Sequence, residues 1–209
     1  MLRACHDSGT NVIRGVDGSW VKPKFLLIPQ ECFTQYDLSR PCLKDAIPEK
    51  HFDLAISTEV AEHLDQKDSN TFIDNLTSFS DVILFSAAIP GQGGTHHVNE
   101  QWPSYWIEKF AARGYVPVDC IRPHIWDDED IRSDARQNLL IFVKEDKLSE
   151  YPAIASEAGR KVLDLVHPNV YKIEKVYNMG FSALCKTIPA AIFYLIPAFI
   201  RAVKKRLKA

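Results

Sequence analysis

Residues 52–64 read FDLAISTEVAEHL, an apolar run that passes directly into a polar, helix-like segment. The first half, residues 52–57, is apolar enough to form a strand buried on both faces, and residues 59–64 have helical character. The next apolar run, DVILFSAAI at residues 81–89, is the most continuous strand candidate in the chain. Strands buried on both faces occur in sheets that carry helices on each side. These stretches therefore predict an open α/β sheet.

The same alternation of strand-like and helix-like segments extends through about the first 145 residues. Further strand candidates are residues 11–17, 32–38, 115–121 and 139–143, and helical spacing covers residues 69–79 and 102–113. Gly114 follows the second helical segment directly, as a helix-ending glycine does. The pattern predicts a mostly parallel sheet with helices on both faces over residues 1–147, and a helical extension over residues 148–209.

The composition is that of a folded globular protein. Of the 209 residues, 46% are hydrophobic and 25% are charged, which argues against a disordered chain. The formal net charge of −2 excludes a uniformly basic nucleic-acid binder. The charge is uneven, because residues 1–174 sum to −9 and residues 175–209 sum to +7 with no acidic residue. We expect two chemically different regions and no nucleic-acid partner.

The cysteines and the first residues of the chain indicate the cellular compartment of the protein. Five cysteines are scattered without a CxxC pair, which predicts reduced thiols and neither a zinc knuckle nor a disulfide framework. The opening residues, MLRACHDSGTN, lack the apolar core of a signal peptide. Both observations favour a cytoplasmic protein.

Polar residues close the predicted strands, and ligands of open α/β sheets bind outside the carboxyl ends of strands. The first strand ends in Asp17-Gly18-Ser19, where the carboxylate can accept both hydroxyls of a ribose and the glycine permits close approach. The second strand ends in Asp37-Leu38, an acid that can accept from an exocyclic amine beside an apolar side chain that can cover a ring. Both acids also fit ordinary turns, an alternative that the residues leave open.

Two further segments carry candidate bases. The third strand ends in Thr58-Glu59, and His63 follows within a short stretch that holds three ionisable groups. The loop after the strongest strand, GQGGTHHVNE, contains His96 and His97. A histidine can remove the proton of an acceptor hydroxyl, and a solvated loop with incidental histidines is the alternative. No ligand spacing marks a metal site among the three histidines, so none is predicted.

The order GVDGSW, YDL, FDLAISTEVAEHL and VILFSAAIPGQGGTHHVNEQWPSYW is similar to that of class I S-adenosylmethionine-dependent methyltransferases, in the branch that contains small-molecule methyltransferases. The resemblance covers roughly residues 10–145 and implies a Rossmann-like methyltransferase sheet. The family's glycine-rich loop, which follows its first and central strand, has no counterpart here. The resemblance therefore predicts an N-terminally incomplete version of that sheet.

The resemblance also implies roles for the residues at the strand ends. S-Adenosyl-L-methionine is the expected cofactor, with Asp17, Gly18 and Ser19 at its ribose. Asp37 and Leu38 are expected at the adenine. Thr58 and Glu59 are expected to form part of the cofactor wall. His63 is expected at the reaction centre, and His96 and His97 are the other candidate bases. The expected function is methyl transfer to a small-molecule acceptor. The alternative is a non-catalytic remnant of the fold or a membrane-associated interaction module.

The last residues combine an apolar stretch with a basic cluster. Residues 188–200 are almost all apolar but contain two prolines, and five lysines and arginines follow in residues 201–208. The stretch is shorter than the roughly 20 residues that a spanning helix needs. Residues 188–208 therefore predict peripheral contact with an anionic membrane surface at its inner face. Packing on the protein's own core or on a partner protein is the alternative.

Overall fold

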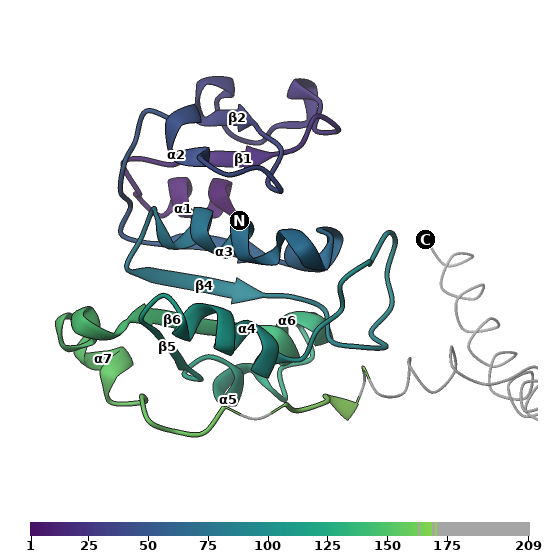
Figure 1. Cartoon of the computed structure of the whole chain (residues 1–209), viewed down its shortest axis with the longest axis vertical. Helices are drawn as coiled ribbons and strands as arrows, with labels where there is room; N and C mark the ends of the chain where they lie inside the picture. Colours follow the sequence, from purple (N-terminus) through teal and green to yellow (C-terminus); the bar gives the residue numbers. More distant parts are fainter. Residues whose placement is uncertain (163, 169, 171–209) are drawn as a thin grey trace, which may run out of the picture. The chain divides into compact units, whose positions relative to one another are not determined.

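The strands of the computed structural model form two separate sheets (Figure 1). The structure describes residues 1–162, 164–168 and 170. A two-stranded parallel sheet pairs β1 (Gly15–Asp17) with β2 (Phe33–Gln35). A four-stranded sheet has the order β3-β4-β6-β5, and its strands are β3 (Ala55–Thr58), β4 (Val82–Ser86), β5 (Tyr115–Val118) and β6 (Leu140–Lys144). The prediction of an α/β fold is confirmed.

The expected single, mostly parallel sheet is not what the structure has. Strands β3 and β4 are parallel, but β6 is antiparallel to both of its neighbours, β4 and β5. The reason for the antiparallel direction of β6 is visible in its pairing with β5, because Val118, the last residue of β5, pairs with Ile141 near the start of β6. The segment after β5 returns to the same end of the sheet, so β6 starts beside the place where β5 stops and must run in the opposite direction. Within the described residues, no strand joins β1 to β3.

Helical segments cover both faces of the four-stranded sheet, as predicted. On one face, α3 (Ser69–Thr77) and α4 (Pro103–Ala111) contribute Phe72, Trp106 and Phe110 to a buried cluster with the sheet residues. The rings of Phe110 and Phe142 are stacked with their centroids 3.9 Å apart. On the other face, residues 148–158, which include α7 (Pro152–Ala155), pack on Val82 and its neighbours.

The two-stranded sheet is attached to α3 through a short helix, α2 (Leu43–Ala46). Leu43, Ile47 and Phe79 form a buried cluster against which residues of the small sheet pack. The buried Asn75 of α3 accepts a hydrogen bond from the Leu43 backbone N–H at 3.2 Å and donates one to the Arg40 carbonyl at 2.8 Å. One side chain thus ties this connection to the large sheet's helix.

The other helices are short: α1 (Leu2–Asp7), α5 (Arg122–Ile125) and α6 (Ser133–Asn138), with 3-10 turns η1 (Pro23–Phe25), η2 (Gln30–Cys32), η3 (Ala61–His63), η4 (Gln66–Asp68) and η5 (Glu145–Glu150). The helix expected over residues 59–64 is therefore a single 3-10 turn. Gly114 has φ of +76°, the left-handed conformation expected of a glycine after a helix.

The chain divides into two units, Met1–His167 and Pro168–Ala209. Most of the second unit, including residues 188–208, lies outside the described residues, so the predicted extension and its tail stay predictions. The described part of residues 148–167 belongs to the first unit. No helix in the described part of the chain is long and apolar enough to cross a membrane.

Candidate functional site

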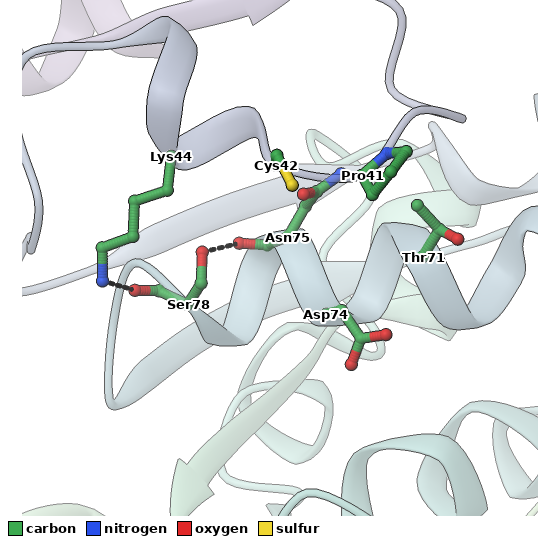
Figure 2. A pocket seen from close by; sticks show the side chains of 7 residues that line it. All are labelled: Pro41, Cys42, Lys44, Thr71, Asp74, Asn75 and Ser78. Atoms are coloured by element: carbon green, nitrogen blue, oxygen red, sulfur yellow. Dashed lines mark hydrogen bonds between the residues drawn. The ribbon is translucent and has the colours of Figure 1, made fainter.

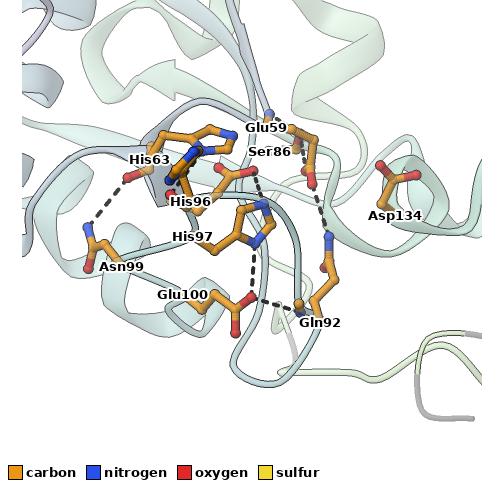
Figure 3. Close-up of polar contacts among 12 residues, drawn as sticks. Glu59, His63, Ser86, Gln92, His96, His97, Asn99, Glu100 and Asp134 are labelled. Carbon is orange, nitrogen blue, oxygen red and sulfur yellow. Dashed lines mark hydrogen bonds and ion pairs between the residues drawn. The ribbon is translucent and has the colours of Figure 1, made fainter. Parts of the chain in front are cut away.

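Polar side chains gather at the carboxyl ends of β3 and β4 (Figure 3). The backbone N–H of Glu59 donates to the Ser86 carbonyl at 3.0 Å, which extends the parallel pair by one residue beyond Thr58. Glu59 itself has φ of +52°, a left-handed conformation that is uncommon outside glycine. This turn ends the strand and leads directly into η3, which places Glu62 and His63 beside the strand ends.

The carboxylate of Glu59 is fully engaged by hydrogen bonds. Its Oε1 accepts from Ser86 Oγ at 2.8 Å and from Asn138 Nδ2 at 3.1 Å, and its Oε2 accepts from Gln92 Nε2 at 3.0 Å. The three donors come from β4, from α6 and from the loop after β4. Glu59 therefore holds these three segments together and presents a rigid polar wall at the strand ends.

Glu62 is the opposite case. Its side chain is completely buried, and neither carboxylate oxygen has a hydrogen-bond partner among the described residues. Burial and then the nearby Glu59 carboxylate raise the pKa of Glu62 to about 7, while His97 and backbone amides offset part of that rise. A buried polar group without a partner is destabilising. The burial of the Glu62 carboxylate therefore calls for a functional or structural explanation.

Two histidine rings lie beside Glu62. His97 Nε2 is 3.9 Å from Glu62 Oε1, and the His63 and His97 rings meet edge to face with centroids 4.9 Å apart. His97 Nδ1 is 2.9 Å from Glu100 Oε1, and His63 Nδ1 is 3.2 Å from the His96 carbonyl oxygen. Since a carbonyl oxygen only accepts, His63 Nδ1 carries the proton, and a carboxylate at His97 Nδ1 favours the same tautomer.

The loop after β4 is shaped by Glu100. This carboxylate accepts from the backbone N–H groups of Gly91 and Gly93, each at 2.8 Å. Gly91 and Gly93 both have positive φ, which allows the loop to wrap around the carboxylate. The backbone N–H groups of Val98 and Asn99 donate to the Glu62 carbonyl at 2.9 and 3.0 Å. The loop is thereby fixed over η3.

The residues predicted at the end of β1 lie in a turn. Asp17 Oδ1 accepts from the Gly18 backbone N–H at 2.7 Å. Gly18 is buried, and the Trp20 ring covers the place that a β-carbon would occupy there. Ser19 is exposed. Asp17 keeps one carboxylate oxygen outside this turn bond, so the turn and the ligand interpretations remain compatible at this residue.

Asp37, at the end of β2, is held by its own turn. Its Oδ1 accepts from the backbone N–H of Ser39 at 3.1 Å and from Ser39 Oγ at 2.7 Å, and its Oδ2 is 3.3 Å from Arg40 Nε. Hydrogen bonds from Ser39, with the Arg40 charge, lower the pKa of Asp37. Leu38 packs partly buried against two apolar clusters. The turn alternative accounts for all of these local contacts.

The structure thus brings together Glu59, His63 and His97, together with Thr58, which ends β3. His96 contributes its backbone carbonyl and has an exposed side chain with φ of +60°. The hydrogen bonds of Asp17 and Asp37 are local and do not reach this group. Sequence reasoning gave no role to Glu62 and Asn138. The only signal for Glu62 was the crowding of ionisable residues after β3.

A cavity of about 190 Å³ lies elsewhere, between α2 and α3 (Figure 2). It is lined by Pro41, Cys42, Lys44, Thr71, Asp74, Asn75 and Ser78. Lys44 Nζ already donates to the Ser78 carbonyl at 2.8 Å, and both ends of the Asn75 amide are paired. Ser78 shortly precedes β4, so the cavity lies toward the opposite end of that strand from Glu59. The cavity is a gap between two packed helices and is not part of the candidate site.

Comparison of the chain with protein-family models, with curated proteins and with solved structures found no match.

Proposed function

We propose that this chain transfers a methyl group from S-adenosyl-L-methionine to a small-molecule acceptor. The observation that carries the proposal is the gathering of Glu59, His63 and His97 at the carboxyl ends of the parallel strands β3 and β4. Ligands of α/β sheets bind at such ends. The sequence resemblance through residues 52–64 and the polar cluster therefore support the same place as the reaction site.

The finer fold that goes with this proposal is a Rossmann-like methyltransferase sheet without its central strand. Two parallel pairs, β1–β2 and β3–β4, with no strand joining them in the described part of the chain, are what that arrangement requires. In Figure 1 the arrows of β1 and β4 point the same way. Their carboxyl ends therefore face the same side, where a shared ligand would lie.

The cofactor, when bound, supplies an electrophilic methyl group. Asp17 would offer the ribose its second carboxylate oxygen, which has no hydrogen-bond partner among the described residues, and Asp37 with Leu38 would flank the adenine. Thr58 and Glu59 would form the wall, since Glu59 is held rigid by three donors. The protein's part is to align the two reactants and accept one proton. His63 is the first candidate base, because its side chain is exposed and Nδ1 faces the His96 carbonyl, so that Nε2 is the lone-pair nitrogen of the neutral ring.

A second function, a non-catalytic interaction module, is favoured by two observations at the ends of β1 and β2. The contacts of Asp37 are all satisfied within its own turn, and Trp20 covers Gly18. Because these local contacts already stabilise the two turns, neither turn needs a ligand to explain its conformation. Binding of S-adenosylmethionine distinguishes the two functions.

Calorimetric titration of the chain with S-adenosylmethionine tests the proposal. We expect binding, and we expect Asp17→Ala to weaken it by about 1.5–3 kcal/mol, because a charge-assisted hydrogen-bond acceptor is lost. The matched control is Asp127→Ala, which removes an exposed acid remote in sequence from the three strand ends and should leave the affinity unchanged. Absence of binding by the folded parent chain would reject the transferase in favour of the interaction module.

A further inference from the structure

The strongest feature that the proposed function leaves unexplained is the set Glu62, His63 and His97. One possible ligand atom from each residue lies within 4.8 Å of the others. We propose that these three side chains bind one divalent transition-metal ion, with two imidazole nitrogens and one carboxylate as ligands. The inference goes beyond methyl transfer and holds whether or not the chain binds S-adenosylmethionine.

The first argument is the state of Glu62. A completely buried carboxylate with both oxygens unpartnered is among the least stable arrangements that a protein interior can hold. A bound cation removes the difficulty, because it supplies a full positive charge and a ligand bond, whereas the His97 ring is 3.9 Å from Oε1 and makes no hydrogen bond to it. The backbone N–H groups of Val98 and Asn99 donate to the backbone carbonyl of Glu62, so they leave its carboxylate unsatisfied.

The second argument is the orientation of the two rings. Metal-bound histidines typically donate their other ring N–H to a carboxylate or a backbone carbonyl. Here His97 Nδ1 lies against Glu100 and His63 Nδ1 lies against the His96 carbonyl, so Nε2 is the ligand atom left on each ring. Glu100 is fixed in turn by two backbone N–H groups of the glycine loop. Both rings thus have the second contact that is typical of metal-binding histidines.

The third argument is distance. A metal–nitrogen bond of about 2.0–2.1 Å places neighbouring ligands of a tetrahedral ion roughly 3.3 Å apart. His97 Nε2 and Glu62 Oε1 are 3.9 Å apart, so they need to approach by well under an ångström. His63 has an exposed side chain and can adjust. His63 is the exposed member of the set, so water or an acceptor hydroxyl could reach the ion from that side.

Two histidines and one carboxylate with an open position suit zinc and the neighbouring first-row metals better than magnesium or calcium, which prefer all-oxygen sites. In the ion-bound protein His63 and His97 act as ligands, and His96 is the histidine left to accept a proton. The ion would lower the pKa of a bound hydroxyl, which assists its deprotonation.

Cobalt(II) titration of the chelator-treated full chain, followed by visible absorption, tests the proposal, and zinc calorimetry measures the affinity. We expect one equivalent to bind with a spectrum of nitrogen and oxygen ligands. Glu62→Gln and His97→Gln should each weaken binding at least 100-fold. Glu100→Gln, which removes the negative charge beside His97 Nδ1 and one of the two oxygens that accept from the Gly91 and Gly93 N–H groups, should weaken it 10- to 100-fold.

The matched control is His96→Asn, since asparagine tolerates the left-handed backbone of that residue and keeps the carbonyl that faces His63. Its affinity should equal that of the parent chain. A cobalt–thiolate charge-transfer band would place the ion at a cysteine and overturn the proposal. Equal binding by the parent and by a folded Glu62→Gln or His97→Gln variant, or no binding by the parent, would also overturn it.

Discussion

At the scale of single residues, Glu62 is a buried carboxylate that lowers the stability of the fold. Its carboxylate is enclosed beside the Glu59 carboxylate, so its ionised form is disfavoured in the folded protein. Glu59 avoids the same conflict, because Ser86, Gln92 and Asn138 donate to it. Two acids three residues apart therefore differ: Glu59 organises the polar cluster, and Glu62 is buried without a hydrogen-bond partner among the described residues.

Glu62 makes the metal-free protein less stable as the pH rises. The folded-state pKa of about 7 lies above the ordinary glutamate value of 4.5, so above pH 4.5 the unfolded chain loses this proton first. The resulting loss of stability grows between pH 4.5 and pH 7 and reaches about 3 kcal/mol. Urea unfolding with excess chelator should therefore show that the free energy of unfolding of the parent chain falls between pH 4.5 and pH 7. The Glu62→Gln variant should lack this fall. The exposed Glu108→Gln is the control and should keep the fall.

The histidines show what sequence could supply at this scale and what it could not. His63 and His97 were both candidates, because they follow strand ends. The choice between His96 and His97 depends on the backbone of the glycine loop, where His96 has φ of +60° and its ring is exposed. Glutamates are almost never fully buried without a partner, so no pattern in STEVAEHL predicts that Glu62 is enclosed.

At the scale of elements, Asn75 is the contact that joins the small sheet's connection to α3. Asn75→Ala leaves the buried Leu43 N–H without a partner and should lower the free energy of unfolding by about 1–3 kcal/mol. Hydrogen exchange at the Leu43 amide should accelerate more than exchange in β4. The control is Asn70→Ala on the same helix, which makes the same change at an exposed position. Equal loss of stability in both variants would assign the effect to the helix alone.

Elements were predictable where apolar periodicity was strong. The patterns at residues 69–79, 81–89 and 102–113 correspond to α3, β4 and α4. The pairing of the strands is harder to predict from sequence, because the place of β6 between β4 and β5 depends on contacts across the sheet and not on local spacing. The 3-10 turn at 61–63 also escaped prediction, since its geometry follows from the left-handed Glu59.

At the scale of the whole molecule, the charge asymmetry gives a prediction for residues 188–208, which lie outside the described part. Their sequence predicts binding to anionic vesicles, with each basic residue contributing roughly 1 kcal/mol. The full chain should sediment with phosphatidylserine vesicles and be released by salt. A chain with Arg201, Lys204, Lys205, Arg206 and Lys208 replaced by glutamine should stay in the supernatant. Sedimentation with neutral vesicles to the same extent would contradict an electrostatic contact.

The position of β6 has a consequence for biosynthesis. Strand β6 is made after β4 and β5 but lies between them, so both strands keep an open edge on the ribosome until residues 140–144 have emerged. Unpaired edges of this kind promote association between nascent chains. We expect chains arrested before Leu140 to aggregate or to recruit chaperones, and chains arrested well beyond Lys144 to resist proteases.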